Sequence, residues 1–413
     1  MEEEIKSLEE NETWTLDVPP KNKNVVSCKW VYITKINADG SLDKRKARLV
    51  ARGFSQKEGV DFFETFSPVG RYETVRTVLA ISLYLDLEMM QFDVKTAFLY
   101  GPLEDDIWMD QPEGFDDESG KMCHLKKGLY GLKQSPRAWN TRFHDSVSLL
   151  GLKRSEEDHC LYYSNDDTRG TILLTLYVDD GVLCTSRKET MDDILDNLSK
   201  EFKITSNQPR TYVGMEITGD RKKKTISLSQ KGYISKILQR FGMQDCKSVI
   251  CPAEPSLKLS KNMKGEEDMS RVPYREAVGV LNYLSVISRP DITYAVSQVS
   301  RFCDNPGFTH WSSVKRIMRY LKGTMNYEAV NGLSEEFRGL ELVGFCDSDW
   351  AGEIDSRGST GGFIFKLNGG PVSWSSRLQK TSALSSTEAE YMAMTEAMKE
   401  VLWFRPLVNW KKT

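Results

Sequence analysis

The order of apolar and polar positions predicts a chain that mixes helices and strands. Residues 171–176 form an apolar run typical of a buried strand, and residues 90–94 predict a second strand. Apolar positions at helical or amphipathic spacing predict helices at residues 3–11, 75–87, 136–150 and 191–202. A hairpin is predicted near the N-terminus, because apolar and polar residues alternate at residues 25–37. A turn at Asp39-Gly40 follows, and a basic segment ending at Phe54 forms the return strand.

The second half of the chain begins with a polar stretch, residues 258–269, which we interpret as a linker because it carries few apolar side chains. Three helical patterns follow, at residues 274–288, 291–303 and 310–322, with breaks at Arg289-Pro290 and Asn305-Pro306. Three alternating segments then predict strands at residues 342–350, 360–367 and 372–382, and Thr387 opens a last helix.

Acidic residues mark the ends of two predicted strands. The apolar run closes on Tyr177-Val178-Asp179-Asp180, and the strand at residues 90–94 carries Asp93. Adjacent carboxylates repel each other and are costly to remove from water, so this arrangement favours a divalent cation. Mg²⁺ is the natural candidate, because it prefers oxygen ligands and leaves positions open for phosphate oxygens. The layout is typical of a two-metal phosphoryl-transfer centre, although Asp is also common in turns for local hydrogen bonding.

Several motifs occur together with these acidic strands in a fixed order. They are Lys46-Ala47-Arg48-Leu49-Val50-Ala51-Arg52-Gly53, Phe92-Asp93-Val94-Lys95-Thr96-Ala97-Phe98-Leu99, Leu129-Tyr130-Gly131-Leu132-Lys133-Gln134 and Ser385-Ser386-Thr387-Glu388-Ala389-Glu390-Tyr391. The order of these motifs resembles the palm of reverse transcriptases, and their amino-acid sequences resemble the Pol polyprotein of copia-type LTR retrotransposons. The resemblance runs from about Trp14 to Trp403, nearly the whole chain.

The resemblance implies an α+β, right-hand polymerase fold followed by an incomplete ribonuclease H-like α/β module. The implied domains are residues 1–257 for the fingers and palm, 258–338 for a linker and a helical thumb or connection, and 339–413 for a truncated ribonuclease H-like domain. Residues 212–217 resemble the primer-gripping hairpin. The implied activity is RNA-directed DNA polymerisation, with two Mg²⁺ ions, or Mn²⁺ in their place, acting on a primer 3′-hydroxyl.

The resemblance also implies roles for single residues. Asp93 and Asp179 would bridge both metal ions, and Asp180 would secure the site or the primer end. Phe98, five residues after Asp93, matches the aromatic gate that excludes ribonucleotides. The alternatives are a surface acid at a strand end for Asp93 and a core phenylalanine for Phe98.

Three further residues match segments that contact the nucleotide in the family. Arg48 and Lys46 match the finger segment that neutralises the triphosphate, and the alternative is a solvated basic strand. Gln134 belongs to a loop, residues 131–136, that would pack beneath the incoming base and the template. The alternative for this loop is a turn that leads into a helix.

Asp347 and Glu390 match the first two metal ligands of ribonuclease H. Glu390 has an alternative role, because Thr387-x-x-Glu390 is also a capping box. The third and fourth Asp of the family do not occur before Thr413, and Pro406 lies inside the expected helix, at a cost of ~3 kcal/mol if the helix continues. We therefore expect a polyprotein fragment whose nuclease module is inactive.

Composition and charge set wider bounds. At 413 residues the chain is too long for a single hydrophobic core, so two or three modules are expected. The 56 basic and 59 acidic residues leave a net charge of −3, which argues neither for nor against binding to nucleic acid. Residues 44–52 are rich in basic side chains and suit phosphates, whereas residues 103–120 are acid-rich and are expected to be solvated. Eight cysteines without a CxxC pair predict reduced thiols, and no apolar run is long enough to span a bilayer.

These observations lead to one leading hypothesis and two rivals. The leading hypothesis expects RNA and DNA template–primer, deoxynucleoside triphosphates and other polyprotein products as partners, no membrane, and a cytoplasmic, particle-associated or nuclear location. The first rival is an inactive relic of the same fold that at most binds nucleic acid. The second is an unrelated structural protein whose Asp pair forms a turn.

Overall fold

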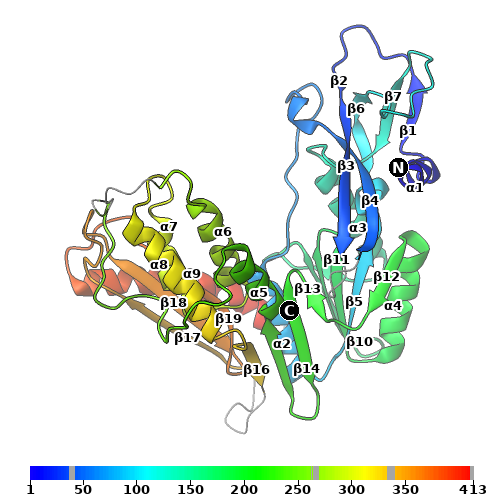
Figure 1. The fold of residues 1–413 in the computed structure, drawn as a ribbon. Helices are drawn as coiled ribbons and strands as arrows, with labels where there is room; N and C mark the ends of the chain where they lie inside the picture. Colours follow the sequence, from blue (N-terminus) through cyan, green and yellow to red (C-terminus); the bar gives the residue numbers. More distant parts are fainter. Residues whose placement is uncertain (37–41, 262, 264–268, 333–339, 410–413) are drawn as a thin grey trace. The chain divides into compact units, whose positions relative to one another are not determined.

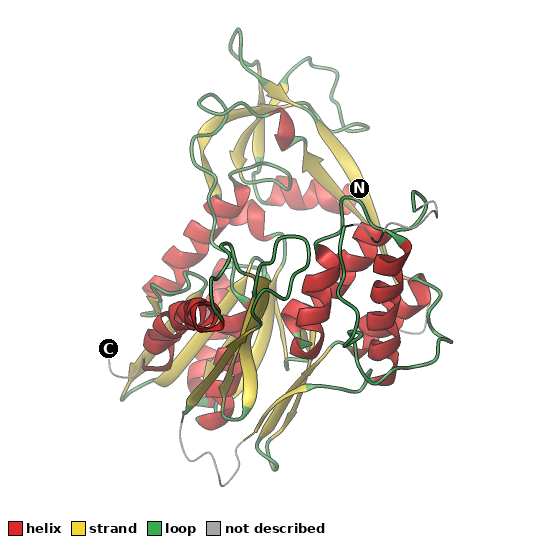
Figure 2. Cartoon of the chain, turned by 90° about the vertical axis from the view of Figure 1, so that its left-hand side faces the viewer, coloured by secondary structure: helices red, strands yellow, loops and turns green. Residues whose placement is uncertain are grey.

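The computed structural model describes residues 1–36, 42–261, 263, 269–332 and 340–409, so the predicted turn at Asp39-Gly40 lies outside the described residues. The chain folds into two compact units. Unit 1 comprises Met1–Gly70 and Met90–Asn207, and unit 2 comprises Arg71–Met89 and Gln208–Thr413. Figure 2 shows helices and strands throughout the chain, in agreement with the predicted mixture of α and β structure.

The largest sheet of unit 1 has six strands in the order β12-β5-β11-β10-β9-β8. Their bounds are Glu88–Val94 for β5, Lys153–Arg154 for β8, Leu161–Asp166 for β9, Gly170–Tyr177 for β10, Asp180–Thr185 for β11 and Ile204–Asn207 for β12. Strand β10 pairs antiparallel with both β9 and β11, and its central residues are buried, as the apolar run predicted.

Two helices of unit 1, α3 (Ser135–Leu149) and α4 (Lys188–Glu201), pack against this sheet. Alternate residues of β10, such as Ile172 and Leu174, point to one face and share a core with Phe143 of α3. The core is closed by Ile194 of α4 and by Phe92 of β5. This packing fixes β5, β10 and β11, the strands that carry the acidic residues.

The remainder of unit 1 forms a second sheet, a long hairpin and an N-terminal helix. The sheet order is β1-β7-β6-β2, with β1 at Trp14–Asp17, β2 at Val25–Val26, β6 at Pro102–Met109 and β7 at Met122–Lys127. Strands β3 (Cys28–Ile36) and β4 (Leu42–Ala51) form the hairpin, which extends toward β10 and β11 in Figure 1. Helix α1 (Glu2–Glu10) packs on β4, because Leu8 and Leu49 share a core.

Unit 2 contains two small sheets. The first has the order β13-β14-β15-β16 and the second β17-β18-β19. Their bounds are Thr211–Tyr212, Met215–Asp220, Thr225–Ser229 and Ala329–Gly332 for β13 to β16, and Leu342–Ser348, Thr360–Leu367 and Gly370–Leu378 for β17 to β19. The second sheet has the antiparallel strands that the sequence predicted, although its assignment to a ribonuclease H module stays a prediction.

Apart from one helix at Lys231–Arg240 that was not predicted, the helices of unit 2 follow the predicted pattern with small shifts at their ends. They are α2 (Tyr72–Tyr84), α5 (Lys231–Arg240), α6 (Tyr274–Ile287), α7 (Thr293–Ser300), α8 (Phe308–Gly323) and α9 (Ser386–Asn409). Helices α5 to α8 share one apolar core. The domains 1–257, 258–338 and 339–413 stay a prediction. The two units are defined by packing, and unit 2 contains residues of all three predicted domains.

The N-terminus of α9 is capped differently from the sequence prediction. The backbone N–H of Glu388 donates to Oγ of Ser385 at 3.1 Å, and the backbone N–H of Leu384 donates to the Glu388 carboxylate at 2.7 Å. The capping box that was the alternative role for Glu390 is therefore not the cap of this helix. The physical reason is that the helix begins at Ser386, so the capping position falls on Ser385.

Helix α9 also continues through Pro406 to Asn409. Proline cannot donate the hydrogen bond that the helix would make at this position. Phe404 and Leu407 are buried, at 0 % and 3 % exposure, so apolar packing holds the last turn in place. The cost of Pro406 is thus offset within unit 2.

Candidate active site

The tip of the hairpin between β10 and β11 brings two acidic residues together. Tyr177 pairs with Asp180, which leaves Val178 and Asp179 at the turn. The backbone N–H of Val94 on β5 donates to the backbone oxygen of Asp179 at 2.8 Å, so the turn that carries Asp179 lies next to the strand that carries Asp93. The strand contact is close, because a Cβ at Gly181 would lie 2.1 Å from Cζ of Phe92.

The backbone beside both acids is strained. Val178, directly before Asp179, has a φ of 60°, and Thr96, shortly after Asp93, has a φ of 54°. β-Branched residues rarely adopt this left-handed conformation. The indole N–H of Trp139 donates to the Val178 oxygen at 2.6 Å and helps to hold the turn. Strain of this kind is concentrated at functional sites, where the surrounding structure enforces it.

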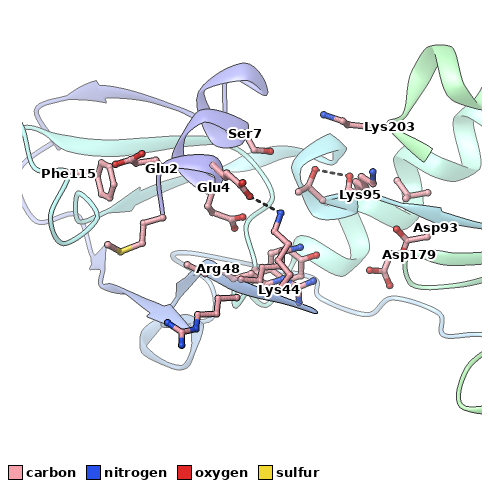
Figure 3. A pocket seen from close by; sticks show the side chains of 18 residues that line it. Glu2, Glu4, Ser7, Lys44, Arg48, Asp93, Lys95, Phe115, Asp179 and Lys203 are labelled. Atoms are coloured by element: carbon pink, nitrogen blue, oxygen red, sulfur yellow. Dashed lines mark hydrogen bonds and ion pairs between the residues drawn. The ribbon is translucent and has the colours of Figure 1, made fainter. Parts of the chain in front are cut away.

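Asp93 and Asp179 face a cavity of about 800 Å³ in unit 1. Figure 3 shows the two carboxylates close together, with Lys44 and Arg48 of β4 beside them and Glu2 and Glu4 of α1 further along the cavity. The cavity is lined by Met1, Glu2, Glu3, Glu4, Ser7, Lys44, Arg45, Lys46, Ala47, Arg48, Asp93, Val94, Lys95, Thr96, Phe115, Tyr130, Asp179 and Lys203.

The cavity has an acidic end and a basic wall. Burial, and then the charge of Asp93, raise the pKa of Asp179, whereas its own backbone N–H and the charges of Arg48 and Lys46 oppose the rise. Burial and the charges of Asp179 and Asp93 raise the pKa of Asp180 to about 6. The carboxylates therefore repel one another in a partly desolvated site, a situation that a bound cation relieves.

Arg48 is held by an aromatic ring. Its guanidinium carbon lies 4.6 Å from the ring centroid of Tyr130, and the ring of Phe98 packs edge-on against Tyr130 at 4.8 Å between centroids. Nε of Arg48 is buried and has no hydrogen-bond partner among the residues that the structure describes. A buried donor without a partner, on a side chain that lines the cavity, suits an anionic ligand.

The structure brings together four of the predicted site residues, since Lys46, Arg48, Asp93 and Asp179 all line the cavity. Asp180 lies at the start of β11, where the side chain of Gln91 donates a hydrogen bond to it, and it is not among the lining residues. Within the described part of the chain, no three Asp, Glu, His or Cys side chains form a metal-binding group. The role of Asp180 stays a prediction.

Gln134 lies outside this cavity. Its amide donates to the backbone oxygen of Asp61 at 2.9 Å and to the carboxylate of Asp105 at 2.8 Å, and its oxygen accepts from Gln56 at 3.0 Å. The side chain is buried, at 4 % exposure, and these hydrogen bonds fix the loop at residues 129–134. The predicted nucleotide contact of Gln134 stays untested.

Several lining residues were missed by the sequence analysis. Tyr130 stands in a quoted motif but was given no role, and α1 was predicted as a helix without a function. Glu3 of α1 pairs with Lys44 at 3.0 Å, and Lys95 and Lys203 add positive charge to the lining of the cavity. A basic residue two positions after Asp93 was the one signal in the sequence that could have indicated this additional charge.

Asp347 and Glu390 lie in unit 2, on β17 and α9. Both side chains are exposed, and neither lines a described cavity. Because Ser385 and Glu388 cap α9, Glu390 is not needed for capping. The assignment of both residues to a ribonuclease H site stays a prediction.

Comparison with known proteins identifies the family. Residues 11–255 match the family described as "Reverse transcriptase (RNA-dependent DNA polymerase)". The chain belongs to this family. It is 44 % identical over 413 residues to the retrovirus-related Pol polyprotein from transposon TNT 1-94 of Nicotiana tabacum, and 38 % identical over 412 residues to that from transposon RE1 of Arabidopsis thaliana. The predicted resemblance to the reverse transcriptase region of copia-type Pol polyproteins is confirmed.

The chain covers only part of the length of these relatives. The matches span 98 % and 99 % of this chain but 31 % and 28 % of the two polyproteins. Among solved structures, a foamy viral protease-reverse transcriptase in complex with double-stranded DNA matches 96 % of this chain and 59 % of its own, with 14 % identity and a TM-score of 0.49. Among the described residues, no helix is long and apolar enough to cross a membrane.

Proposed function

We propose that this chain is an RNA-directed DNA polymerase that adds deoxynucleotides to a primer 3′-hydroxyl. The observation that carries the proposal is the cavity in which Asp93 and Asp179 meet the basic side chains of Lys46 and Arg48. Phosphoryl transfer needs little covalent chemistry from the protein, and it depends on positioning and on electrostatic stabilisation. An acidic pair next to a basic strand supplies both.

The donor set suits magnesium. Asp93 and Asp179 offer only oxygen ligands, and Mg²⁺ binds through one or two carboxylates and takes its other ligands from water and phosphate. Two such ions, when bound, lower the pKa of the primer hydroxyl and neutralise the leaving pyrophosphate. Mn²⁺ fits the same ligands. We assign to Asp180 the task of supporting this site from the neighbouring strand.

The chain's own side chains orient the nucleotide. Arg48 and Lys46 would bind the triphosphate, since both line the cavity and their charges reach Asp179. Template–primer and deoxynucleoside triphosphates are then the partners, and other products of the polyprotein are further ones. We place this activity in the cytoplasm, in particles, or in the nucleus.

Primer extension tests the proposal. The purified chain should extend a DNA primer on an RNA template when Mg²⁺ is present and should stop when a chelator removes it. The rival, an inactive relic of the same fold, predicts binding of the template–primer without any extension. A chain that binds the duplex but adds no nucleotide would favour the relic.

Phe98→Ala is expected to admit ribonucleotides. Phe98 is half-buried and packs against Tyr130, which lines the cavity with both acids, so it stands close enough to act as a steric gate. A gate works by clash, and a smaller side chain removes the clash. The measurement is the ratio of kcat/KM for a deoxynucleotide to that for the matching ribonucleotide, which should fall by roughly tenfold or more. An unchanged ratio would mean that Phe98 serves only as a packing residue.

No cleavage of an RNA–DNA hybrid is expected from unit 2. Asp347 and Glu390 are exposed, and neither side chain lines one of the described cavities. A two-metal nuclease needs carboxylates that converge on both ions. The check is a hybrid-cleavage assay with the purified chain and Mg²⁺. Cleavage that disappears in Asp347→Asn or Glu390→Gln would show that this expectation is mistaken.

A further inference from the structure

Tyr130 stands between the two side chains to which the proposed function gives nucleotide roles. Its ring lies 4.6 Å from the guanidinium carbon of Arg48 and 4.8 Å from the ring of Phe98, whose plane is tilted by 69°. Tyr130 itself lines the cavity with Asp93 and Asp179. One ring therefore contacts both the basic side chain and the aromatic side chain beside the acidic pair.

The backbone fixes this ring in place. The N–H of Ala51, at the end of β4, donates to the backbone oxygen of Tyr130 at 2.8 Å. A Cβ at Gly131 would lie 2.0 Å from the Ala51 oxygen, and the φ of Gly131 is 97°, so only glycine fits here. Gln56 further joins the two segments, because its side chain oxygen accepts from the N–H of Lys133 at 2.9 Å. Tyr130 is thus attached to the strand that carries Arg48.

Arg48 needs such a support. Its Nε is buried without a hydrogen-bond partner among the described residues, and its guanidinium packs on the Tyr130 ring. A cation over an aromatic face gains about 0.5–2 kcal/mol, depending on how far it is desolvated. A long side chain that is held in advance loses less entropy when its ligand arrives.

The Tyr130 hydroxyl is neutral at physiological pH. Burial raises the pKa of Tyr130, with smaller increases from Asp179, Glu4 and Asp93 and a decrease from Arg48. The side chain therefore does not act as a base. Its contribution lies in the ring, which has the same shape in phenylalanine.

We propose that Tyr130 is a positioning residue that sets nucleotide affinity through Arg48 and sugar selectivity through Phe98. This inference rests on the proposed function, because it assumes that Arg48 binds the triphosphate and that Phe98 excludes ribonucleotides. It predicts that one substitution changes both properties, and that each change is transmitted by a different neighbour.

The test compares Tyr130→Leu, which removes the ring, with Tyr130→Phe, which keeps it. Tyr130→Leu should raise the KM for a deoxynucleotide by roughly three- to thirtyfold, as expected for the loss of one cation–π contact, with kcat changed less than about threefold. It should also lower the discrimination against ribonucleotides. Tyr130→Phe should restore both values. Tyr32→Leu is the control, because Tyr32 is an exposed aromatic residue of the β3–β4 hairpin. Its KM and its discrimination against ribonucleotides should match those of the parent.

Double variants separate the two routes. If Tyr130 acts through Arg48, the KM effect of Tyr130→Leu should nearly vanish in an Arg48→Gln background. If it acts through Phe98, the loss of discrimination should nearly vanish in a Phe98→Ala background. Additive effects in both backgrounds, or a loss of kcat alone in Tyr130→Leu, would overturn the inference.

Direct binding distinguishes a failure of this inference from a failure of the proposed function. The binding of a deoxynucleoside triphosphate with Mg²⁺ to the purified chain can be followed by protein fluorescence, without any turnover. If the parent chain binds the nucleotide but does not extend primers, the polymerase proposal is overturned. Weaker nucleotide binding by Tyr130→Leu would still support the inference in that case. A parent that neither binds nor incorporates the nucleotide overturns both.

Discussion

Asp179→Asn is expected to slow primer extension by roughly a thousandfold or more, which corresponds to at least about 4 kcal/mol of lost transition-state stabilisation. The substitution keeps the size and shape of the side chain and removes one of the two aspartate carboxylates that line the cavity. Steady-state extension on a primed RNA template measures the effect. Binding of the template–primer should change little, since contacts to phosphates along the duplex dominate that affinity.

The same substitution is expected to leave the fold at least as stable as in the parent. Burial and Asp93 raise the pKa of Asp179, so its charged form is destabilised in the folded chain at neutral pH. A neutral amide removes this penalty. Unfolding measured without Mg²⁺ should therefore show an equal or higher midpoint, and an activity loss that came from unfolding would show the reverse.

Asp166→Asn is the matched control. Asp166 ends β9, at the hairpin turn that leads into the opposite end of β10, and it accepts hydrogen bonds from Thr168 and Arg169 within that turn. Asp166 is exposed and its hydrogen bonds stay within the turn, so Asp166→Asn should extend primers at the parent's rate. If Asp179→Asn extended primers as fast as this control, Asp179 would be a turn residue and the two-metal assignment would fail.

The sequence allowed the strongly periodic elements to be predicted closely. Helix α3 was expected at residues 136–150 and covers Ser135–Leu149, and β10 follows the apolar run. These elements bury one face or both, so their pattern is strong. Strand β16 was missed because Ala329–Gly332 is short, and its pairing with β15 joins distant parts of the chain. Strand β6 was missed because its outward residues are acidic.

Residues of the candidate site could be predicted where the type of the residue indicates its chemistry. They could not be predicted where their role depends on contacts between distant parts of the chain. The acidic residues were identified from their positions at the ends of predicted strands, and Arg48 and Lys46 from the resemblance of their segment to the family. Tyr130 was not, because its contact with Arg48 joins segments far apart in the sequence. The hydrogen bonds of Gln134 to Asp61 and Asp105 could not be predicted for the same reason, and its predicted nucleotide contact stays a prediction.

Arg76 joins three elements of unit 2 through one buried side chain. It lies on α2 with 1 % exposure, and its guanidinium donates to the backbone oxygens of Val372 at 2.7 Å and of Val286 and Ile287 at 2.9 Å. It also pairs with Glu73 at 3.2 Å. Burial lowers the pKa of Arg76 to about 10, so it remains charged at neutral pH. Strand β19 and the end of α6 are thereby attached to α2.

This attachment predicts a graded stability within the last sheet. Strand β17 has largely exposed residues, and Tyr391 and Met398 of α9 are exposed at 64 % and 50 %, so residues 342–410 should exchange amide hydrogens faster on average than residues 92–177. Strand β19 should be the exception. Its Trp374 donates to the backbone oxygen of Ser285 at 2.7 Å in addition to the bonds of Arg76.

Arg76→Met is expected to destabilise unit 2 by about 3–5 kcal/mol, because it removes a buried guanidinium and leaves the backbone oxygens of Val372, Val286 and Ile287 without their donor. Methionine fills much of the same volume, so the loss would come from the missing donors rather than from a cavity. Hydrogen exchange read out by peptide should show β19 and the end of α6 losing protection together, while β10 in unit 1 keeps its rate.

Arg221→Met provides the comparison for this result. Arg221 also pairs with an acid, Glu88, at 2.7 Å, but its side chain is 58 % exposed, and exposed pairs contribute roughly 0–1 kcal/mol. Its exchange pattern should match the parent. If β19 in Arg76→Met stayed as protected as in Arg221→Met, the sheet would be held by contacts other than those of Arg76. Coincident loss of protection in β19 and α6 would instead identify Arg76 as the link between them.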